Sequence, residues 1–379
     1  MREGTRVRYV KDREFAAALR QRAAAYFASA TWPRNGDRPL QVYVLVVTGT
    51  WWASYLALVF VAESLWIAAP ALTVLVLFSP AVAVTGHSLS HGMLDRTRAA
   101  RLLARYTTIS LGFDEPWWTQ KHNHLHHRYT NVFGLDDDLD QRSILRLSAR
   151  APWRPHHRYQ WLYAWALYLS THLAMIVAGE VRYMATGRIG GRHHERTGPR
   201  GYAVWIFHKA IAASVLFGIP ASLHPVGTVA LVFLAWSAAF SLILSVIFQT
   251  SHCVGDRTYP QPDPRTGVVP VDWRIAQILG TVDVAARNPV FTWLYGGLSL
   301  HVAHHLFPGA SPTHYRGLTG IVRGLAEARG IRYRSYPTLR SAIRAHHVFL
   351  RTMGQPNGVG LRAADLAFVG PEGRADTVW

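Results

Sequence analysis

Cysteine is nearly absent from this chain of 379 residues, which contains only Cys253. A single thiol excludes a disulfide-stapled scaffold, and it excludes thiolate-rich metal sites and iron–sulfur clusters. Histidine, by contrast, occurs twenty times. If the protein binds a metal ion, nitrogen ligands must therefore hold it.

Charged residues are also scarce. They make up 16% of the chain, whereas soluble domains contain roughly 25%. The net charge of +18 comes almost entirely from arginine, because the only lysines are Lys11, Lys121 and Lys209. No basic run is interleaved with a recognisable nucleic-acid-binding module, so we expect no nucleic-acid partner. Anionic lipid or phosphorylated substrates are the expected partners of this positive charge.

Long stretches of the chain carry no charge at all. Between Arg38 and Asp95 the only charged side chain is Glu63, which separates the uncharged blocks 41–62 and 64–86. Each block has roughly the 20 residues that a membrane-spanning helix needs. Both outer flanks are basic, so the positive-inside rule predicts a transmembrane hairpin with both ends in the cytoplasm. We expect residues 1–39 to be a basic cytosolic segment and not a cleavable signal peptide.

Three more apolar blocks follow, at 159–179, 203–222 and 226–248. The segment between the first two is rich in arginine and is predicted to be cytoplasmic, whereas the turn 223–225 lacks Lys and Arg. Blocks 203–222 and 226–248 then form a second hairpin, and 159–179 is a re-entrant or interfacial helix. Alternatively, 159–179 spans the membrane and 203–222 lies on its surface. Either arrangement predicts an all-α integral membrane protein with four transmembrane helices and both termini in the cytosol.

The polar segments 87–158 and 249–353 are expected to form a cytosolic helical cap, with helix around 312–353. Residues 40–353 would then be one membrane domain. The tail 354–379, rich in Gly and small residues, is expected to be loosely ordered and flexible. A composition rich in arginine and poor in cysteine fits the bacterial cytoplasmic (inner) membrane.

Nine histidines fall in four places, HSLSH, HNHLHH, QTSH and HVAHH, each just beyond a predicted inner membrane boundary. Neutral imidazole suits iron, zinc, copper and nickel, and about four ligands saturate one zinc ion. Nine candidates therefore match two metal ions, and an all-nitrogen pair favours iron and dioxygen chemistry over hydrolysis. The candidate ligands are His87, His91, His122, His126, His127, His252, His301, His304 and His305.

Other polar and aromatic residues near these histidines have two interpretations each. Acidic and amide side chains lie within and after the second cluster. In one interpretation they accept hydrogen bonds from ligand imidazoles, and in the other they form a loop that caps a helix. Two tryptophans before that cluster would line the substrate entrance, or belong to an interfacial aromatic belt. These residues are Asp136, Asp137, Asp138, Asn123 and Asn131, and then Trp117 and Trp118.

Adjacent histidines outside the four clusters are expected to face solvent or lipid headgroups, because arginines surround them. These pairs are His156–His157, His193–His194 and His346–His347.

Three segments, HSLSHG, KHNHLHHRYTNVFGLDDDLD and GGLSLHVAHHLFP, resemble the histidine boxes of the membrane fatty acid desaturase family. The similarity is greatest to the bacterial branch that acts on acyl chains carried by CoA or lipid. HHRYQWLYAWALYL and GLAEARGIRYRSYPTLRSAIRAHHVFLRTMG resemble the family too, so the likeness extends over about residues 40–355. It implies a mushroom-shaped protein in which four membrane helices carry a cytosolic cap with a di-iron site. By position, the nine histidines would be the iron ligands, with His252 the ligand outside the boxes.

The resemblance also implies the reaction. Family members take two electrons from ferredoxin or cytochrome b5, activate O2 at iron and remove two hydrogens from an acyl chain held in an apolar tunnel. No catalytic residue beyond the iron ligands is implied. The chain carrier would be CoA, a carrier protein or a lipid. No haem domain precedes residue 40, so we expect the electron donor and its reductase to be separate proteins.

The chain departs from the family pattern at three positions. Ser88 stands where the first box usually has an acidic residue, His301 where many relatives have Gln, and Ala303 where many have Glu. The first change removes a carboxylate that would orient a ligand of the first box. We expect Asp136, Asp137 or Asp138 to compensate for it. A hydroxylase or an acetylenase on the same scaffold is the alternative activity. A metal-binding transporter is a weaker alternative, because no span centre carries the charges of a transport path.

Overall fold

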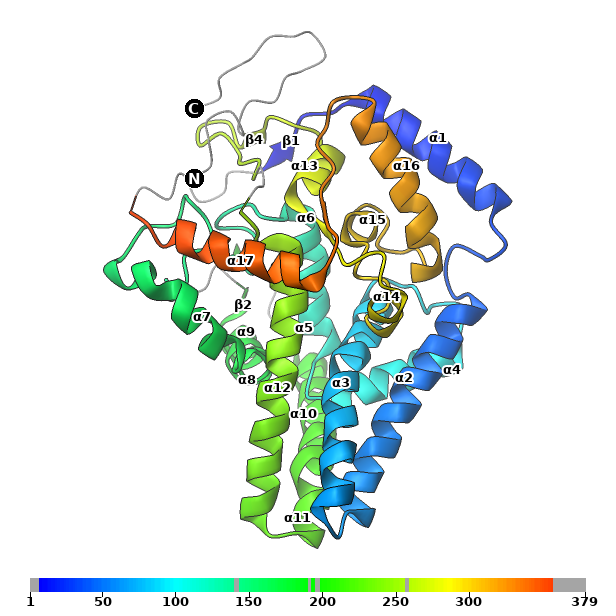
Figure 1. Ribbon diagram of the computed structural model, residues 1–379, viewed down its shortest axis with the longest axis vertical. Helices are drawn as coiled ribbons and strands as arrows, with labels where there is room; N and C mark the ends of the chain where they lie inside the picture. The colour runs from blue at the N-terminus through cyan, green and yellow to red at the C-terminus, as the bar shows by residue number, and fades with distance from the viewer. Residues whose placement is uncertain (1–6, 140–142, 190–191, 195–197, 256–258, 357–379) are drawn as a thin grey trace.

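The computed structural model describes residues 7–139, 143–189, 192–194, 198–255 and 259–356. The molecule consists of a stalk of long helices that carries a broader cap of short helices (Figure 1). The expected tail 354–379 lies outside the described residues, apart from its first three positions.

Four helical segments of the stalk are long and apolar enough to span a membrane: Arg38–Val61, Leu65–Ser90, Pro199–Leu223 and Val226–His252. They confirm the four predicted spans. The first comprises α2 (Arg38–Leu56) and the π-helical η1 (Ala57–Val61), the second is α3 (Leu65–Ser90), the third comprises α10 (Pro199–Ala213), η5 (Ser214–Gly218) and α11 (Ile219–Leu223), and the fourth is α12 (Val226–His252). α3 and α12 extend past the predicted boundaries and carry their last turns into the cap.

The stalk helices are tied together by buried polar contacts as well as by apolar packing. The indoles of Trp51 on α2 and Trp236 on α12 both donate to the Ser79 hydroxyl on α3, at 3.0 and 2.8 Å. The outward faces stay apolar, with Leu231 69% and Leu234 53% exposed. Exposed leucines on a helix of this length suit contact with lipid chains.

The segment predicted at 159–179 is not one straight helix. It contains the 3₁₀ turn η3 (Pro155–Tyr159), α7 (Gln160–Tyr168), α8 (Thr171–Leu173), the π-helical η4 (Ala174–Gly179) and α9 (Glu180–Thr186). The chain bends by 78° between Tyr168 and Thr171. At the bend the His172 amide donates to the Ser241 hydroxyl of α12 at 2.9 Å, instead of continuing the α7 ladder. By length and composition this pair is a broken span or a re-entrant segment.

The cap consists of helices that precede, separate and follow the stalk segments in the sequence. Among the described residues it also contains three short two-stranded ladders. α1 packs along α16, and their core includes Phe15, Leu19, Val322 and Leu325. The cap helices are α1 (Arg13–Ser29), α4 (Arg98–Ser110), α5 (Glu115–Thr119), η2 (Gln120–His126), α6 (His127–Tyr129), α13 (Trp273–Gly280), α14 (Pro289–Leu294), α15 (His301–Leu306), η6 (Pro312–His314), α16 (Tyr315–Glu327) and α17 (Leu339–Met353). The ladders pair β1 (Arg8–Tyr9) with β4 (Val268–Val269) in parallel, β2 (Arg188–Ile189) with β3 (Arg192–His193) antiparallel, and β5 (Asp283–Val284) with β6 (Ser335–Tyr336) in parallel.

The helix expected around 312–353 is interrupted. α16 ends at Glu327, an extended stretch with β6 follows, and α17 begins after Thr338. Thr338 caps α17 by accepting from the Ser341 amide at 3.1 Å. Because of this break, α17 folds back and packs against α12 near the end of α12 that enters the cap (Figure 1).

Candidate metal centre and adjoining cavities

The first histidine pair lies where α3 leaves the stalk. α3 ends at Ser90, and His91 is its C-terminal capping residue, with its amide donating to the His87 carbonyl at 3.3 Å. Residues four apart share one face of a helix, so both imidazoles point in the same direction. The continuation of α3 beyond the apolar span therefore aims both side chains under the cap.

The second cluster is carried by a π-helical turn. Asp114 starts this region by accepting the Trp117 amide at 3.1 Å, and η2 then runs from Gln120 to His126 before α6 resumes at His127. π-helical turns are found frequently at functional sites. Here the wide turn presents His122 and His127 to one group of imidazoles and His126 to another.

The remaining ligand candidates come from the end of α12 and from α15. His252 is the last residue of α12, and His301, His304 and His305 lie on the short helix α15. All four side chains are buried. Segments from four places in the sequence thus meet beneath the cap, as the spacing of the clusters predicted.

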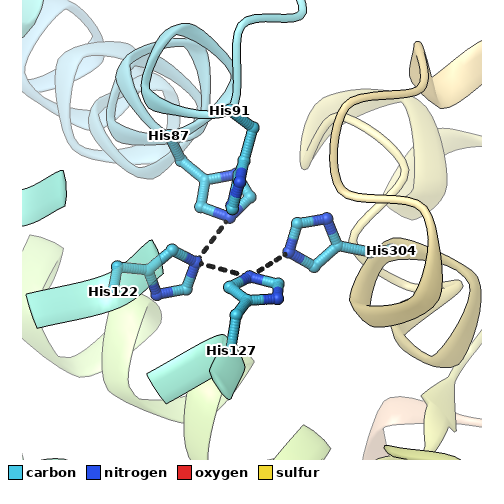
Figure 2. A group of neighbouring side chains, drawn as sticks. All are labelled: His87, His91, His122, His127 and His304. Carbon is cyan, nitrogen blue, oxygen red and sulfur yellow. Dashed lines mark hydrogen bonds between the residues drawn. The ribbon is translucent and has the colours of Figure 1, made fainter. Parts of the chain in front are cut away.

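Five imidazoles form the first group (Figure 2). Their nearest nitrogens are the Nε2 atoms: His122 Nε2 lies 2.9 Å from that of His87 and 3.0 Å from that of His127, and His127 Nε2 lies 3.1 Å from that of His304. His91 Nε2 is buried and has no hydrogen-bond partner within the described part of the chain. Nitrogens that converge in this way, without a carboxylate among them, form a donor set suited to a metal ion.

The second group contains His126, His252 and His305, and His301 adjoins it. His301 Nε2 lies 2.7 Å from His252 Nε2 and 3.2 Å from His305 Nε2. His126 Nε2 is buried with no partner among the described residues. The structure therefore gathers all nine candidate histidines, five in one group and four in the other.

The electrostatics keep most of these imidazoles neutral. Burial lowers the pKa of His122, His127, His304 and His305, and neighbouring imidazoles lower it further. Burial, with a smaller contribution from His126, lowers the pKa of His91 to about 3. A neutral imidazole has a lone pair to give to a metal, which a protonated one lacks.

His126 differs because a carboxylate faces it. Burial lowers the pKa of His126, but the charge and hydrogen bond of Asp136, together with the charge of Asp138, outweigh burial, so the pKa is raised. Asp136 Oδ1 and Oδ2 both lie 3.1 Å from His126 Nδ1. A proton held on Nδ1 leaves Nε2 as the ligand atom and makes it more basic.

The aspartates after the second box have different contacts. Asp136 also accepts the backbone amides of Asn131 at 2.7 Å and Asp138 at 3.1 Å, which fixes its carboxylate. Asp138 reaches His126 Nδ1 at 3.2 Å and pairs with Lys121, whereas Asp137 pairs with Lys121 at 3.4 Å. These contacts are to the second box, so within the part of the chain that the structure describes these three aspartates do not replace the carboxylate missing at Ser88 of the first.

The two asparagines bind backbone and not imidazole. Asn123 Nδ2 donates to the Ser90 carbonyl at 2.7 Å, and Asn131 Nδ2 donates to the Gly280 carbonyl at 2.6 Å. Asn131 therefore positions Asp136 through its own amide, and Asn123 links the second box to the end of α3.

Sequence reasoning missed several residues that contact candidate ligands, Gln277 and Tyr315 among them. Gln277 Oε1 accepts His305 Nδ1 at 2.8 Å, and the Tyr315 hydroxyl lies 3.1 Å from His304 Nδ1. Both fix ring orientation in the way that Asp136 does. Neither residue belongs to a histidine box or to a spacing pattern around one, so only the fold reveals its contact.

The histidine pairs outside the boxes do not all face solvent, contrary to expectation. His157 and His346 are buried, and each bonds to a backbone carbonyl, of Ser143 at 2.9 Å and Cys253 at 2.6 Å. The neighbouring arginines misled the prediction, because His157 lies on the inner side of a 3₁₀ turn and His346 on the buried face of α17. The side chain of His193 lies outside the described residues.

Two cavities adjoin the histidine groups. The apolar cavity is lined mainly by α3, α4 and α12, and His87 forms part of its wall. The polar cavity is lined by η2, the aspartate loop and α8 to α9, with His126 and His252 in its wall. Four residues line both cavities, and we call them the throat: Trp118, Met175, Leu244 and Phe248. Trp117 lines the polar cavity only.

Comparison with known proteins identifies the family of this protein. The family model described as fatty acid desaturase matches residues 64–337. The chain belongs to the fatty acid desaturase family. It is thus an oxidoreductase of fatty acid metabolism that desaturates a fatty acyl chain.

Individual family members resemble it over most of their length. An sn-1 linoleoyl-lipid 6-desaturase of Synechocystis is 26% identical over 92% of this chain and 98% of its own. An enzyme of the same name from Arthrospira platensis is 26% identical over 92% and 95%. An acyl-lipid (8-3)-desaturase of Physcomitrium patens is 26% identical over 91% of this chain and 72% of its own.

Proposed function

We propose that this desaturase holds two iron ions with the nine histidines and introduces a double bond into an acyl chain of a membrane lipid. Residues 40–353 would be the catalytic domain, with the cap and both termini on the cytosolic side of a bacterial inner membrane. In the balanced reaction, two acyl hydrogens, two electrons and two protons convert O2 to two water molecules. A separate protein such as ferredoxin or cytochrome b5 would supply the electrons.

The observation that carries this proposal is the position of the two histidine groups. His87 of the first group lines the apolar cavity, and His126 and His252 of the second line the polar cavity. An acyl chain that passes from one cavity to the other through the throat would therefore lie against both groups. Iron, when bound, would supply the activation of O2 that an unactivated methylene requires.

The residues of the chain have defined tasks in this mechanism. The neutral imidazoles bind the metal ions, and Asp136, Gln277 and Tyr315 hold three of the rings in one orientation. The throat side chains are apolar apart from the Trp118 nitrogen, so they exclude water from the reacting carbons. Trp118 also stacks on His122, with ring centroids 4.8 Å apart. It would thus align the acyl chain with the first group.

A lipid substrate is favoured by the relatives, whose names are those of acyl-lipid desaturases. The bent segment α7 to α9 offers the acyl chain a route from the membrane, since it lines the polar cavity beside α12. CoA and carrier-protein esters would reach the site from the cytosol instead.

The test is expression in a bacterium that lacks desaturases, followed by mass spectrometry of its acyl chains. We expect a product that has lost two hydrogens, and about two iron ions per chain by elemental analysis. His304→Ala and His305→Ala should abolish the product and reduce the iron content. His124→Ala is the matched control, because this exposed histidine of the second box belongs to neither group. A product that gains one oxygen would show a hydroxylase, and protein without iron would contradict the metal assignment.

A further inference from the structure

The rim of the polar cavity is basic. Arg182 on α9 and Arg188 on β2 line this cavity, and both side chains are exposed. At the other end of the same cavity, His126 and His252 are buried. One cavity therefore connects a charged, accessible edge with the candidate metal centre.

The aspartates that line the cavity already have partners. Asp137 and Asp138 pair with Lys121, and Asp136 holds His126 Nδ1 and two backbone amides. Arg182 and Arg188 have no carboxylate within ion-pair distance in the part of the chain that the structure describes. Both arginines are exposed, so an anion from outside the protein can reach them.

The rim lies beside surface that suits lipid. Val177 and Val181, which precede Arg182, are 56% and 47% exposed, and Ile206 on the neighbouring α10 is 60% exposed. In Figure 1, α9 and β2 lie at the base of the cap, where the stalk begins. Arginines that border exposed apolar side chains at the end of a membrane segment lie at the depth of lipid phosphates.

We propose that Arg182 and Arg188 bind the phosphate of a phospholipid and thereby hold its acyl chain at the entrance of the throat. Guanidinium groups match phosphate geometry and bind it by paired hydrogen bonds. This inference rests on the proposed lipid desaturation and adds to it the class of headgroup, an anionic phosphate ester. A neutral glycolipid with the same acyl chains would lack the partner that the rim offers.

The test measures binding in the purified protein, independently of turnover. Native mass spectrometry and titration would compare dioctanoyl phosphatidylglycerol with dioctanoylglycerol, which has the same chains and no phosphate. We expect Arg182→Gln/Arg188→Gln to weaken binding of the phospholipid at least tenfold, and to leave binding of dioctanoylglycerol unchanged. Arg340→Gln/Arg344→Gln, which removes two exposed arginines of α17 outside the cavity, should change neither.

The possible outcomes are distinct. Equal loss of both ligands would mean that the arginines only support the fold, and it would overturn the proposal. Arginine-dependent binding of octanoyl-CoA in preference to phosphatidylglycerol would also overturn it, since the carrier would be CoA. If wild-type protein bound the phospholipid through these arginines but formed no unsaturated product in cells, the phosphate site would stand and the proposed desaturation would fail.

Discussion

At the scale of single residues, the contact between Asp136 and His126 is the most informative. Asp136→Asn keeps the shape of the side chain but removes the charge that holds the Nδ1 proton of His126. We expect metal content or activity to fall by about 10- to 100-fold, the usual effect of losing a carboxylate that orients a ligand. Asp137→Asn is the control, because the ion-pair partner of Asp137 is Lys121. Equal losses in both variants would contradict the assigned role.

The ligand candidates themselves could be predicted from the sequence, whereas the residues that orient them could not. The histidines stand in short clusters, which are visible in the sequence without knowledge of the fold. Gln277 and Tyr315 reach His305 and His304 because α13 and α16 pack against α15. Such contacts depend on how helices meet, and a single sequence does not contain that information.

At the scale of elements, a buried polar network joins α5, α9 and α10. Glu180 is fully buried and pairs with Lys209 at 2.5 Å, while the Asp114 amide donates to Glu180 at 3.1 Å. Lys209→Met leaves this carboxylate without its cation, which costs about 3–5 kcal/mol for a buried pair. The melting temperature in detergent should fall. The double variant Glu180→Gln/Lys209→Met should recover part of the loss, and no recovery would show that the pair is not coupled.

The packing of α17 gives a pH-dependent prediction. Burial lowers the pKa of His346 to about 4, whereas the unfolded chain takes up this proton near pH 6.5. Stability from His346 is therefore full above pH 6.5 and is lost as the pH falls toward 4, by about 1–3 kcal/mol in total. His346→Gln should flatten the decline of the melting temperature over this range. His347→Gln, on the same helix, controls for the loss of a histidine, and an unchanged slope in His346→Gln would refute the assignment.

The helices could be predicted from the sequence better than the breaks between them. Apolar length located all four spans within a few residues, because crossing a bilayer requires a long uncharged run. The bend after Tyr168 depends on Ser241 of α12 accepting the His172 amide. That partner is distant in the sequence, and hydropathy does not reveal it.

At the scale of the whole molecule, the throat residues line both cavities, so an acyl chain that occupied both cavities would have to pass them. Leu244 of the throat is buried, on α12. Leu244→Trp should close the passage and reduce product at least tenfold, because the larger side chain would fill the space between the two cavities. Iron content should stay at the wild-type level. Leu234→Trp makes the same change on the exposed face of α12 and should be neutral. Full activity in Leu244→Trp would exclude the throat as the substrate path.

If the substrate phosphate binds at the arginine rim as proposed, the span from the rim to the histidine groups would fix the position of the acyl chain. A headgroup held at Arg182 and Arg188 places a set number of carbons before the throat, and the remainder of the chain extends into the apolar cavity. The new double bond would then stand at a constant position counted from the carboxyl carbon, whatever the chain length. Hosts fed acids of different lengths would reveal this, whereas a position that is constant from the methyl end would mean that the far end of the cavity sets the count.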